Sequence, residues 1–327
     1  MALGNSYSPK DFQVYILSES TAGNTALHAS DMLQLDVDSV GFPSLNVNQA
    51  TEVRTSVTSI LQLADFYSEN AMRVTEISLS GVLHNDAGHK ALLSNITSDA
   101  STPYQIVGST FAPYEGQYAT TSASDNKTFT LSVRSPDHSN AYSLVMNGCV
   151  CTNFSISADA NTEGGRYKWS ATIQSGLKPV LNEATTLAGS TVHNGVDISL
   201  PTATVKKINN LAIIMQSFSW AIDSPAVFTG VASTGYEVVA RGSETSVTAD
   251  ATIKLDSVSR DLMTSYDSGT VMESNAFLLT NGTSFSTTIK NAVFTDVSYN
   301  EGDVMMLNTS MKAVASGAEA VISVVTG

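Results

Sequence analysis

The chain has 327 residues and a formal net charge of −14, from 30 acidic and 16 basic residues. This balance argues against a nucleic-acid reader, because such proteins neutralise phosphates with clustered Lys and Arg. Charged residues make up only 14% of the chain, below the roughly 25% of a typical soluble domain. Ser, Thr and Asn therefore carry most of the polar surface. Such a surface fits either a protein covered by copies of itself or an ordinary Ser/Thr-rich β protein.

No apolar run approaches the ~20 residues that a helix needs to span a bilayer, which argues against a membrane role. Residues 1–12 lack the basic and apolar segments of a secretory signal peptide. We therefore expect synthesis in the cytoplasm and no export by that route.

Apolar and polar residues alternate along the first half, as they do in antiparallel strands with one buried face. The alternation predicts strands at 33–38, 75–81, 154–159 and 167–173, and a short helix is expected at 88–96. In the first of these strands, Asp36 and Asp38 lie on the polar side. The last two strands are separated by a turn at 161–164 and predict a hairpin.

The second half repeats this order. Alternation predicts strands at 246–255, 293–299 and 304–311, with a short helix at 257–266. In the first of them Asp250 shares the polar side with Thr248 and Thr252, and continued alternation adds Asp256. An internal repeat indicates one architecture used twice, so the sequence predicts a mostly β protein with one short helix in each repeat.

Two long segments, 42–73 and 225–241, occupy matching places before the strand that leads into each helix. A hairpin arm that leaves the domain would explain both, although an ordinary surface loop fits equally well. The Pro-flanked stretch 177–201 is the best candidate connection. We place the domains at 1–180, with a loop or insertion at 98–126, and at 206–327, with a linker region at 181–205.

Candidate chemistry is sparse. The chain has no G-x-S-x-G elbow, P-loop or dinucleotide-binding fingerprint. His84 and His89 lack the spacing of a zinc pair on either a helix or a strand. Cys149 and Cys151 are interpreted as two reduced thiols on a buried or half-buried strand. We expect no enzymatic activity, no cofactor and no metal.

Taken together, several segments resemble a bacteriophage tail tube (major tail) protein. They are 216–220 (QSFSW), the arm at 224–241, the strand at 246–256 and the final hairpin at 293–311. The first half is similar at 32–48, 73–96 and 144–173. The resemblance covers nearly the whole chain apart from 98–126 and 177–201, and it consists of element order and strand character. Single-domain tube proteins are about half this length, so the chain resembles a tandem, two-domain form.

The resemblance implies two similar antiparallel β-sandwich or barrel domains, each with a short flanking α-helix. Inner strands of neighbouring subunits would join into a ring-shaped β-barrel, and the rings would stack into a tube in the virion tail. It implies self-association, contacts with the tape measure protein and with tail terminator and tip proteins, and passage of double-stranded DNA. Because each chain carries two units, we predict a ring of three chains.

A channel that passes DNA should repel phosphate, so acidic residues are expected on its wall. The candidates that face the lumen are Asp36, Asp38, Glu76, Asp250 and Asp256. The candidates for contacts between subunits or rings lie in the arms and are Thr51, Glu52, Arg54, Phe228, Tyr236 and Arg241. The alternative is a carbohydrate-binding or adhesion β-sandwich of a virion fibre or baseplate, which would need an exposed aromatic platform.

Overall fold

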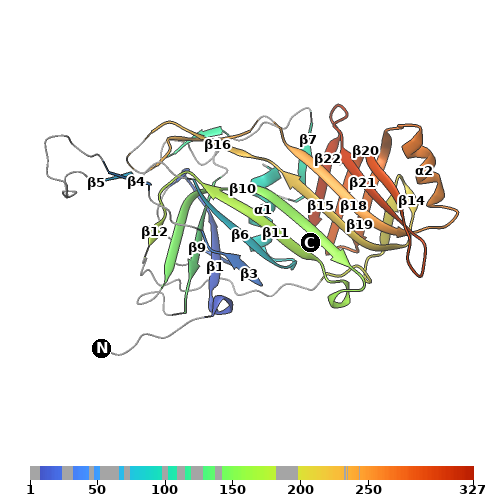
Figure 1. Ribbon diagram of the computed structural model, residues 1–327, viewed down its shortest axis with the longest axis horizontal. Coiled ribbons are helices and arrows are strands. Elements are labelled where there is room, and N and C mark those ends of the chain that lie inside the picture. Colours follow the sequence, from blue (N-terminus) through green and yellow to red (C-terminus); the bar gives the residue numbers. More distant parts are fainter. Residues whose placement is uncertain are drawn as a thin grey trace.

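The computed structural model describes residues 8–23, 32–43, 48–51, 66–69, 74–97, 102–108, 115–118, 128–136, 142–181, 198–231, 233, 235–242 and 244–327 (Figure 1). These residues form a mostly β structure with large antiparallel sheets and two α-helices, α1 (Ala87–Thr97) and α2 (Arg260–Asp267). Short 3₁₀ helices lie at Pro9–Asp11 (η1) and Glu163–Gly165 (η3).

A long antiparallel sheet, called here the central sheet, runs through the molecule (Figure 1). Its strand order is β3 (Ser39–Gly41), β6 (Thr75–Val82), β11 (Lys168–Ser175), β10 (Ser143–Asp159), β15 (Met215–Asp223), β18 (Ser246–Lys254), β21 (Met306–Ala313) and β20 (Phe285–Asn300). Residues from both halves of the sequence thus share one hydrogen-bonded sheet, joined where β10 pairs with β15.

Two strands leave the central sheet and continue into further sheets. The first part of β10 lies in the order β2 (Leu33–Leu35), β1 (Gln13–Ser18), β9 (Phe129–Arg134), β10, β12 (Val180–Leu181). The first part of β20 lies in the order β14 (Leu211–Ala212), β13 (Val205–Ile208), β19 (Met272–Asn281), β20, β22 (Ala320–Thr326), β7 (Tyr104–Val107).

Gly148 lies where β10 shifts its register against β9. Its φ is +62°, and an added Cβ would lie 2.3 Å from the Tyr118 ring. Only glycine combines that backbone conformation with so close an approach. The irregularity in β10 therefore requires glycine at position 148.

Two small sheets complete the fold. One has the order β16 (Ala226–Thr229), β17 (Val238–Arg241), β8 (Glu115–Gln117), and the other pairs β4 (Asn48–Thr51) with β5 (Phe66–Glu69). The β4–β5 hairpin projects from the end of the molecule, away from the central sheet (Figure 1).

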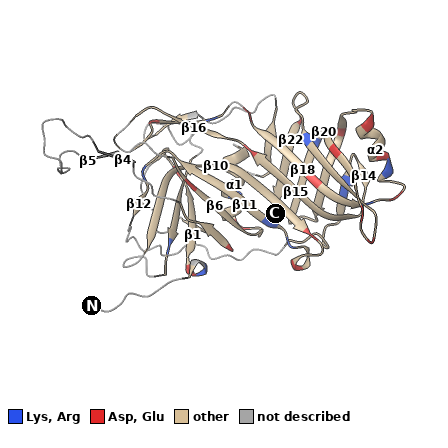
Figure 2. Cartoon of the chain, viewed as in Figure 1, with Lys and Arg blue, Asp and Glu red and all other residues tan. Residues whose placement is uncertain are grey.

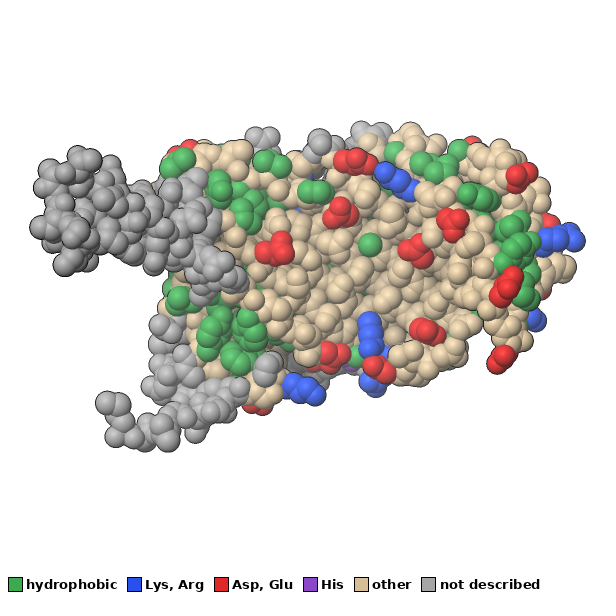
Figure 3. Space-filling model, in the orientation of Figure 1, with side chains coloured by type: hydrophobic (Ala, Val, Ile, Leu, Met, Phe, Trp, Pro, Cys, Tyr) green, Lys and Arg blue, Asp and Glu red, His purple; other side chains and the backbone are tan. Residues whose placement is uncertain are grey.

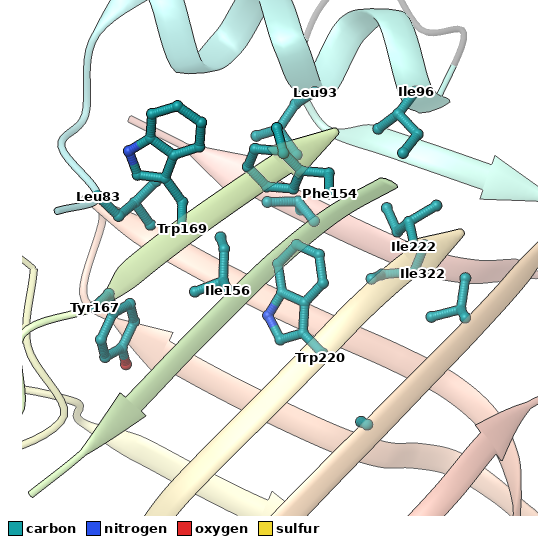
Figure 4. Packing of buried hydrophobic residues seen from close by; sticks show 14 of the residues in the cluster. Leu83, Leu93, Ile96, Phe154, Ile156, Tyr167, Trp169, Trp220, Ile222 and Ile322 are labelled. Carbon is teal, nitrogen blue, oxygen red and sulfur yellow. The ribbon is translucent and has the colours of Figure 1, made fainter. Parts of the chain in front are cut away.

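The apolar face of the central sheet forms the core. Trp169, Phe154 and Trp220 lie side by side on neighbouring strands, with α1 above them and Leu93 and Ile96 pointing toward the sheet (Figure 4). The Phe154 and Trp169 rings are stacked with centroids 6.3 Å apart. Each fully buried side chain of this size contributes about 1.5–3 kcal/mol of burial free energy, so this row anchors both halves.

Most predicted elements are present. The helices begin and end within a few residues of the predicted limits, and the hairpins β10–β11 and β20–β21 form as expected. The Asp86 carboxylate accepts a hydrogen bond of 2.9 Å from the His89 backbone N–H and caps the start of α1.

The single strand predicted at 33–38 is wrong. β2 ends at Leu35 and pairs with β1, whereas β3 begins at Ser39 and pairs with β6. The chain changes sheets between them, and it packs so closely that a Cβ on Gly81 would lie 2.8 Å from the Asp36 carbonyl oxygen.

The predicted loop or insertion at 98–126 contributes strands to the fold. Within its described part, β7 pairs with β22 and β8 pairs with β17. Of the predicted linker region at 181–205, residues 182–197 lie outside the described residues.

Candidate functional site

The face of the central sheet opposite the core is covered with short polar side chains. Along β6, β11 and β18, and along β15 from Phe218 onward, every second residue is buried, so the alternate residues form polar rows. Hydrogen bonds link these rows across strands, including Ser155 to Ser170 at 2.8 Å and Thr252 to Asn308 at 3.0 Å. Figure 3 shows this face as a broad tan area with scattered charges of both signs.

The polar face is hollowed where β10, β15, β18 and β21 lie side by side. Hydroxyl and amide groups line most of the groove, with Asp159, Arg166, Lys168 and Asp250 among them. The groove therefore combines many hydroxyl and amide groups with two basic and two acidic side chains.

Two of the predicted lumen acids lie on this polar face. Glu76 is exposed on β6, and its carboxylate accepts a hydrogen bond of 2.7 Å from the Gln174 side chain. Asp250 is exposed on β18, 3.4 Å from the Ser219 hydroxyl. Acidic residues are spread along the strands and not gathered in one cluster (Figure 2). That this face lines a channel stays a prediction.

Asp36 and Asp38 lie at the edge of the sheet, between β2 and β3. The Asp36 carboxylate is 3.0 Å from His84 Nε2, and its side chain is 44% exposed. Asp38 is exposed and its backbone N–H donates to the Ser80 carbonyl oxygen at 2.8 Å. Both are therefore placed at the β3 edge and not within a polar row.

Asp256 has a different environment from the one that alternation predicts. β18 ends at Lys254, and the Asp256 carboxylate accepts hydrogen bonds from the Val258 and Ser259 backbone N–H groups, at 2.9 and 3.0 Å. These hydrogen bonds lower the pKa of Asp256, and the bond from the Ser259 N–H has the largest effect. Its carboxylate holds the turn before α2 in place, so the prediction that it extends the polar row of β18 is wrong.

The first arm is partly described. β4 and β5 pair only with each other among the described strands, and Thr51 lies opposite Phe66. Glu52 and Arg54 lie outside the described residues. A two-stranded hairpin is marginally stable in water by itself, which favours a partner surface for this arm.

The second arm is folded against its own chain. The Phe228 and Tyr236 rings are 5.9 Å apart, Phe228 packs beside Gly176, and the Tyr236 N–H donates to the Gly176 carbonyl oxygen at 3.0 Å. β17 pairs on its other side with β8 from the first half. The β16–β17 hairpin therefore joins the two halves of one chain.

Arg241 is the clearest correction in this arm, because it is only 7% exposed. Its guanidinium donates to the carbonyl oxygens of Cys151 and Ser224 and to the backbone and side-chain oxygens of Asn95. Arg241 thus ties α1, β10 and the end of β15 together inside one chain, and it is unavailable for a contact with another subunit.

Glu19, in the first half of the chain, has a buried carboxylate that the sequence analysis did not single out. Glu19 accepts hydrogen bonds from the Gly23 and Gly148 backbone N–H groups and from the Thr128 and Thr130 hydroxyls. Burial raises its pKa above the ordinary value of 4.5. No local pattern distinguishes Glu19, because apart from Gly23 its partners, Thr128, Thr130 and Gly148, lie more than 100 residues away in the sequence.

The two cysteines are buried and free, as interpreted from the sequence. Burial raises the pKa of Cys151 to about 12, so this thiol is unreactive at neutral pH. In the described part of the chain, no three His, Cys, Asp or Glu residues are placed to hold a metal ion. No helix there has the length and apolar character to cross a membrane.

Comparison with known proteins adds no family assignment. No protein-family model matches the chain, and no curated protein matches its sequence.

Proposed function

We propose that the chain is a structural subunit of a bacteriophage tail tube, which assembles in stacked rings around a channel for double-stranded DNA. The observation that carries this proposal is the junction of β10 with β15, where strands from the first half and strands from the second half of the chain meet edge to edge in one sheet. The function is that of a self-assembling wall and involves no catalysis.

The strand pairings support a duplicated architecture. In the first half the pairs are β1–β2, β1–β9, β9–β10, β10–β11, β10–β12, β6–β11, β3–β6 and β4–β5. In the second half the pairs, in the same order, are β13–β14, β13–β19, β19–β20, β20–β21, β20–β22, β18–β21, β15–β18 and β16–β17. Each pair of the first half has its counterpart, and α1 and α2 follow the corresponding strands β6 and β18.

The proposal includes a ring of three chains, which this arrangement supports. One chain supplies two four-stranded units, β3–β6–β11–β10 and β15–β18–β21–β20, joined side by side. Three chains would supply six such units and close an annulus, which satisfies both outer edges of each central sheet. The ring-shaped β-barrel is thus a property of the assembly.

The polar face of the central sheet would line the channel. The apolar face is covered by core and α1, so the hydroxyl-rich face with Glu76 and Asp250 is available to the lumen. Carboxylates there act on DNA within a Debye length of about 8–10 Å. The projecting β4–β5 hairpin would contact the next ring, and tape measure, terminator and tip proteins would contact the lumen and the tube ends.

The alternative, a carbohydrate-binding or adhesion sandwich, has weaker support. Both tryptophans, Trp169 and Trp220, are 1% exposed in the core, where they cannot stack on a sugar. No observation on the described residues favours that alternative over a tube subunit.

Electron microscopy of the concentrated protein tests the proposal. We expect rings or tubes of uniform width, and a map with threefold symmetry in which each chain contributes two similar units to the inner wall. Discrete monomers at every concentration, salt and temperature tried would contradict the proposed function. Sixfold symmetry would contradict only the three-chain ring.

A further inference from the structure

The central sheet has two outer edges among the described residues. β3 pairs only with β6, and β20 beyond Ala292 pairs only with β21. Each edge presents unpaired backbone N–H and C=O groups, which are a template for another strand. Each edge is therefore free to pair with a strand of another chain.

The junction of the two units within one chain shows how two such edges pair. Where its two units meet, β10 pairs antiparallel with β15, so that Ser157 lies opposite Ser219 and Ile156 lies opposite Trp220. Ile156 and Trp220 are 0% and 1% exposed, on the core side of the sheet. In the duplicated scheme, the outer edges β20 and β3 are the counterparts of β10 and β15.

A bulge fixes the correspondence between β10 and β20. Pairing of β10 with β11 shifts at Thr152, and pairing of β20 with β21 shifts at Thr295. Counting from these two residues, Ile156 corresponds to Tyr299 and Ser157 corresponds to Asn300.

The pairing partners carry the correspondence across to the other edge. Phe154 lies two residues beyond the bulge and is paired with Ala171 on β11. Ala171 is paired with Leu79 on β6, and Leu79 is paired with Val40 on β3. The same steps from Val297 lead through Thr309 and Ala251 to Phe218 on β15. Val40 therefore corresponds to Phe218, Gly41 to Ser219 and Phe42 to Trp220.

We propose that the β20 edge of one chain pairs antiparallel with the β3 edge of the next, with Asn300 opposite Gly41 and Tyr299 opposite Phe42. The inference rests on the proposed tube function and specifies its contact between chains. The partner is a second copy of the same chain, and the contact is head to tail, because two different edges meet.

Exposure of the two aromatic residues supports this pairing. Tyr299 is 54% exposed and Phe42 is 39% exposed, although both stand in rows whose counterparts are buried in the internal junction. Phe42 also contacts Phe12 and Tyr142, with ring centroids 4.9 and 5.6 Å away, which holds it in position at the edge. Hydrophobic side chains are visible toward both ends of the molecule (Figure 3). A cross-strand aromatic pair would bury both rings on the core side of the sheet.

Disulfide trapping tests the register. The native cysteines are fully buried, so introduced thiols are the reactive ones. Chains with Asn300→Cys are mixed with chains carrying Gly41→Cys, assembled and oxidised; only a bond between chains can then join them. We expect a covalent dimer from the mixture. We expect less than one tenth of that yield from a matched mixture of Asp296→Cys with Gly41→Cys, because a four-residue displacement separates the sites by about 13 Å.

Each outcome decides a different point. Tubes or rings that form while the displaced pair cross-links better than the Asn300/Gly41 pair would overturn the register and leave the proposed function intact. Efficient dimers from the Asn300→Cys chain alone would overturn the head-to-tail contact in favour of a twofold one. Failure of the unmodified chain to associate under any condition would overturn both the contact and the proposed function.

Discussion

Replacing Arg241 with alanine should destabilise the chain more than any surface change. The side chain is 7% exposed, and its guanidinium donates to oxygens of Cys151, Ser224 and Asn95. Alanine would remove these donors and leave buried acceptors unsatisfied, each at a cost of about 1–3 kcal/mol, partly offset by water that enters the space. We expect a loss of about 3–5 kcal/mol in the free energy of unfolding.

Urea unfolding of the unassembled chain, followed by tryptophan fluorescence and circular dichroism, measures this loss. Arg241→Lys should recover part of it, because an ammonium group can reach some of the carbonyls but lacks the planar fork. Lys312→Ala is the matched control: that lysine pairs with Glu244 at 3.0 Å on the surface, and exposed pairs contribute about 0–1 kcal/mol. An Arg241→Ala loss no greater than that of the control would refute the assignment of Arg241 as an internal tie.

Three further predictions concern acidic side chains. Burial raises the pKa of Glu19 above 4.5. The contribution of Glu19 to stability is therefore complete below pH 4.5 and is lost as the pH rises through the pKa of the folded state. Glu19→Gln should remove that pH dependence in unfolding measurements and cost about 1–3 kcal/mol, because the glutamine amide would face backbone donors. Asp86→Ala should cost about 1 kcal/mol through loss of the α1 cap, with Asp86→Asn close to the original protein, as thermal melts would reveal. Chains with Glu76→Lys and Asp250→Lys should still form tubes, but virions built from them should eject DNA more slowly; normal ejection kinetics would argue that these residues do not line the channel.

Much of the secondary structure could be predicted because its signals are local. A period of two residues places Phe154 and Ile156 on one face and Ser155 on the other whichever strands lie beside them. The same pattern located the core side of β18 and its exposed Asp250. The helices were predicted as short runs after polar turns, and in the structure the Asp86 carboxylate satisfies a backbone N–H group at the start of α1.

What tertiary structure decided were the pairings and the ends of strands. Alternation continued to Asp256, but β18 ends where its partner β21 begins, at Met306 opposite Lys254. A buried arginine such as Arg241 is indistinguishable in sequence from a surface one, because its acceptors come from segments up to 146 residues away. The junction of β10 with β15 could not be predicted either, because the hydrogen bonds between strand edges are made by backbone groups that every residue other than proline carries. The sequence thus indicates where strands lie, and the tertiary structure determines which edges pair.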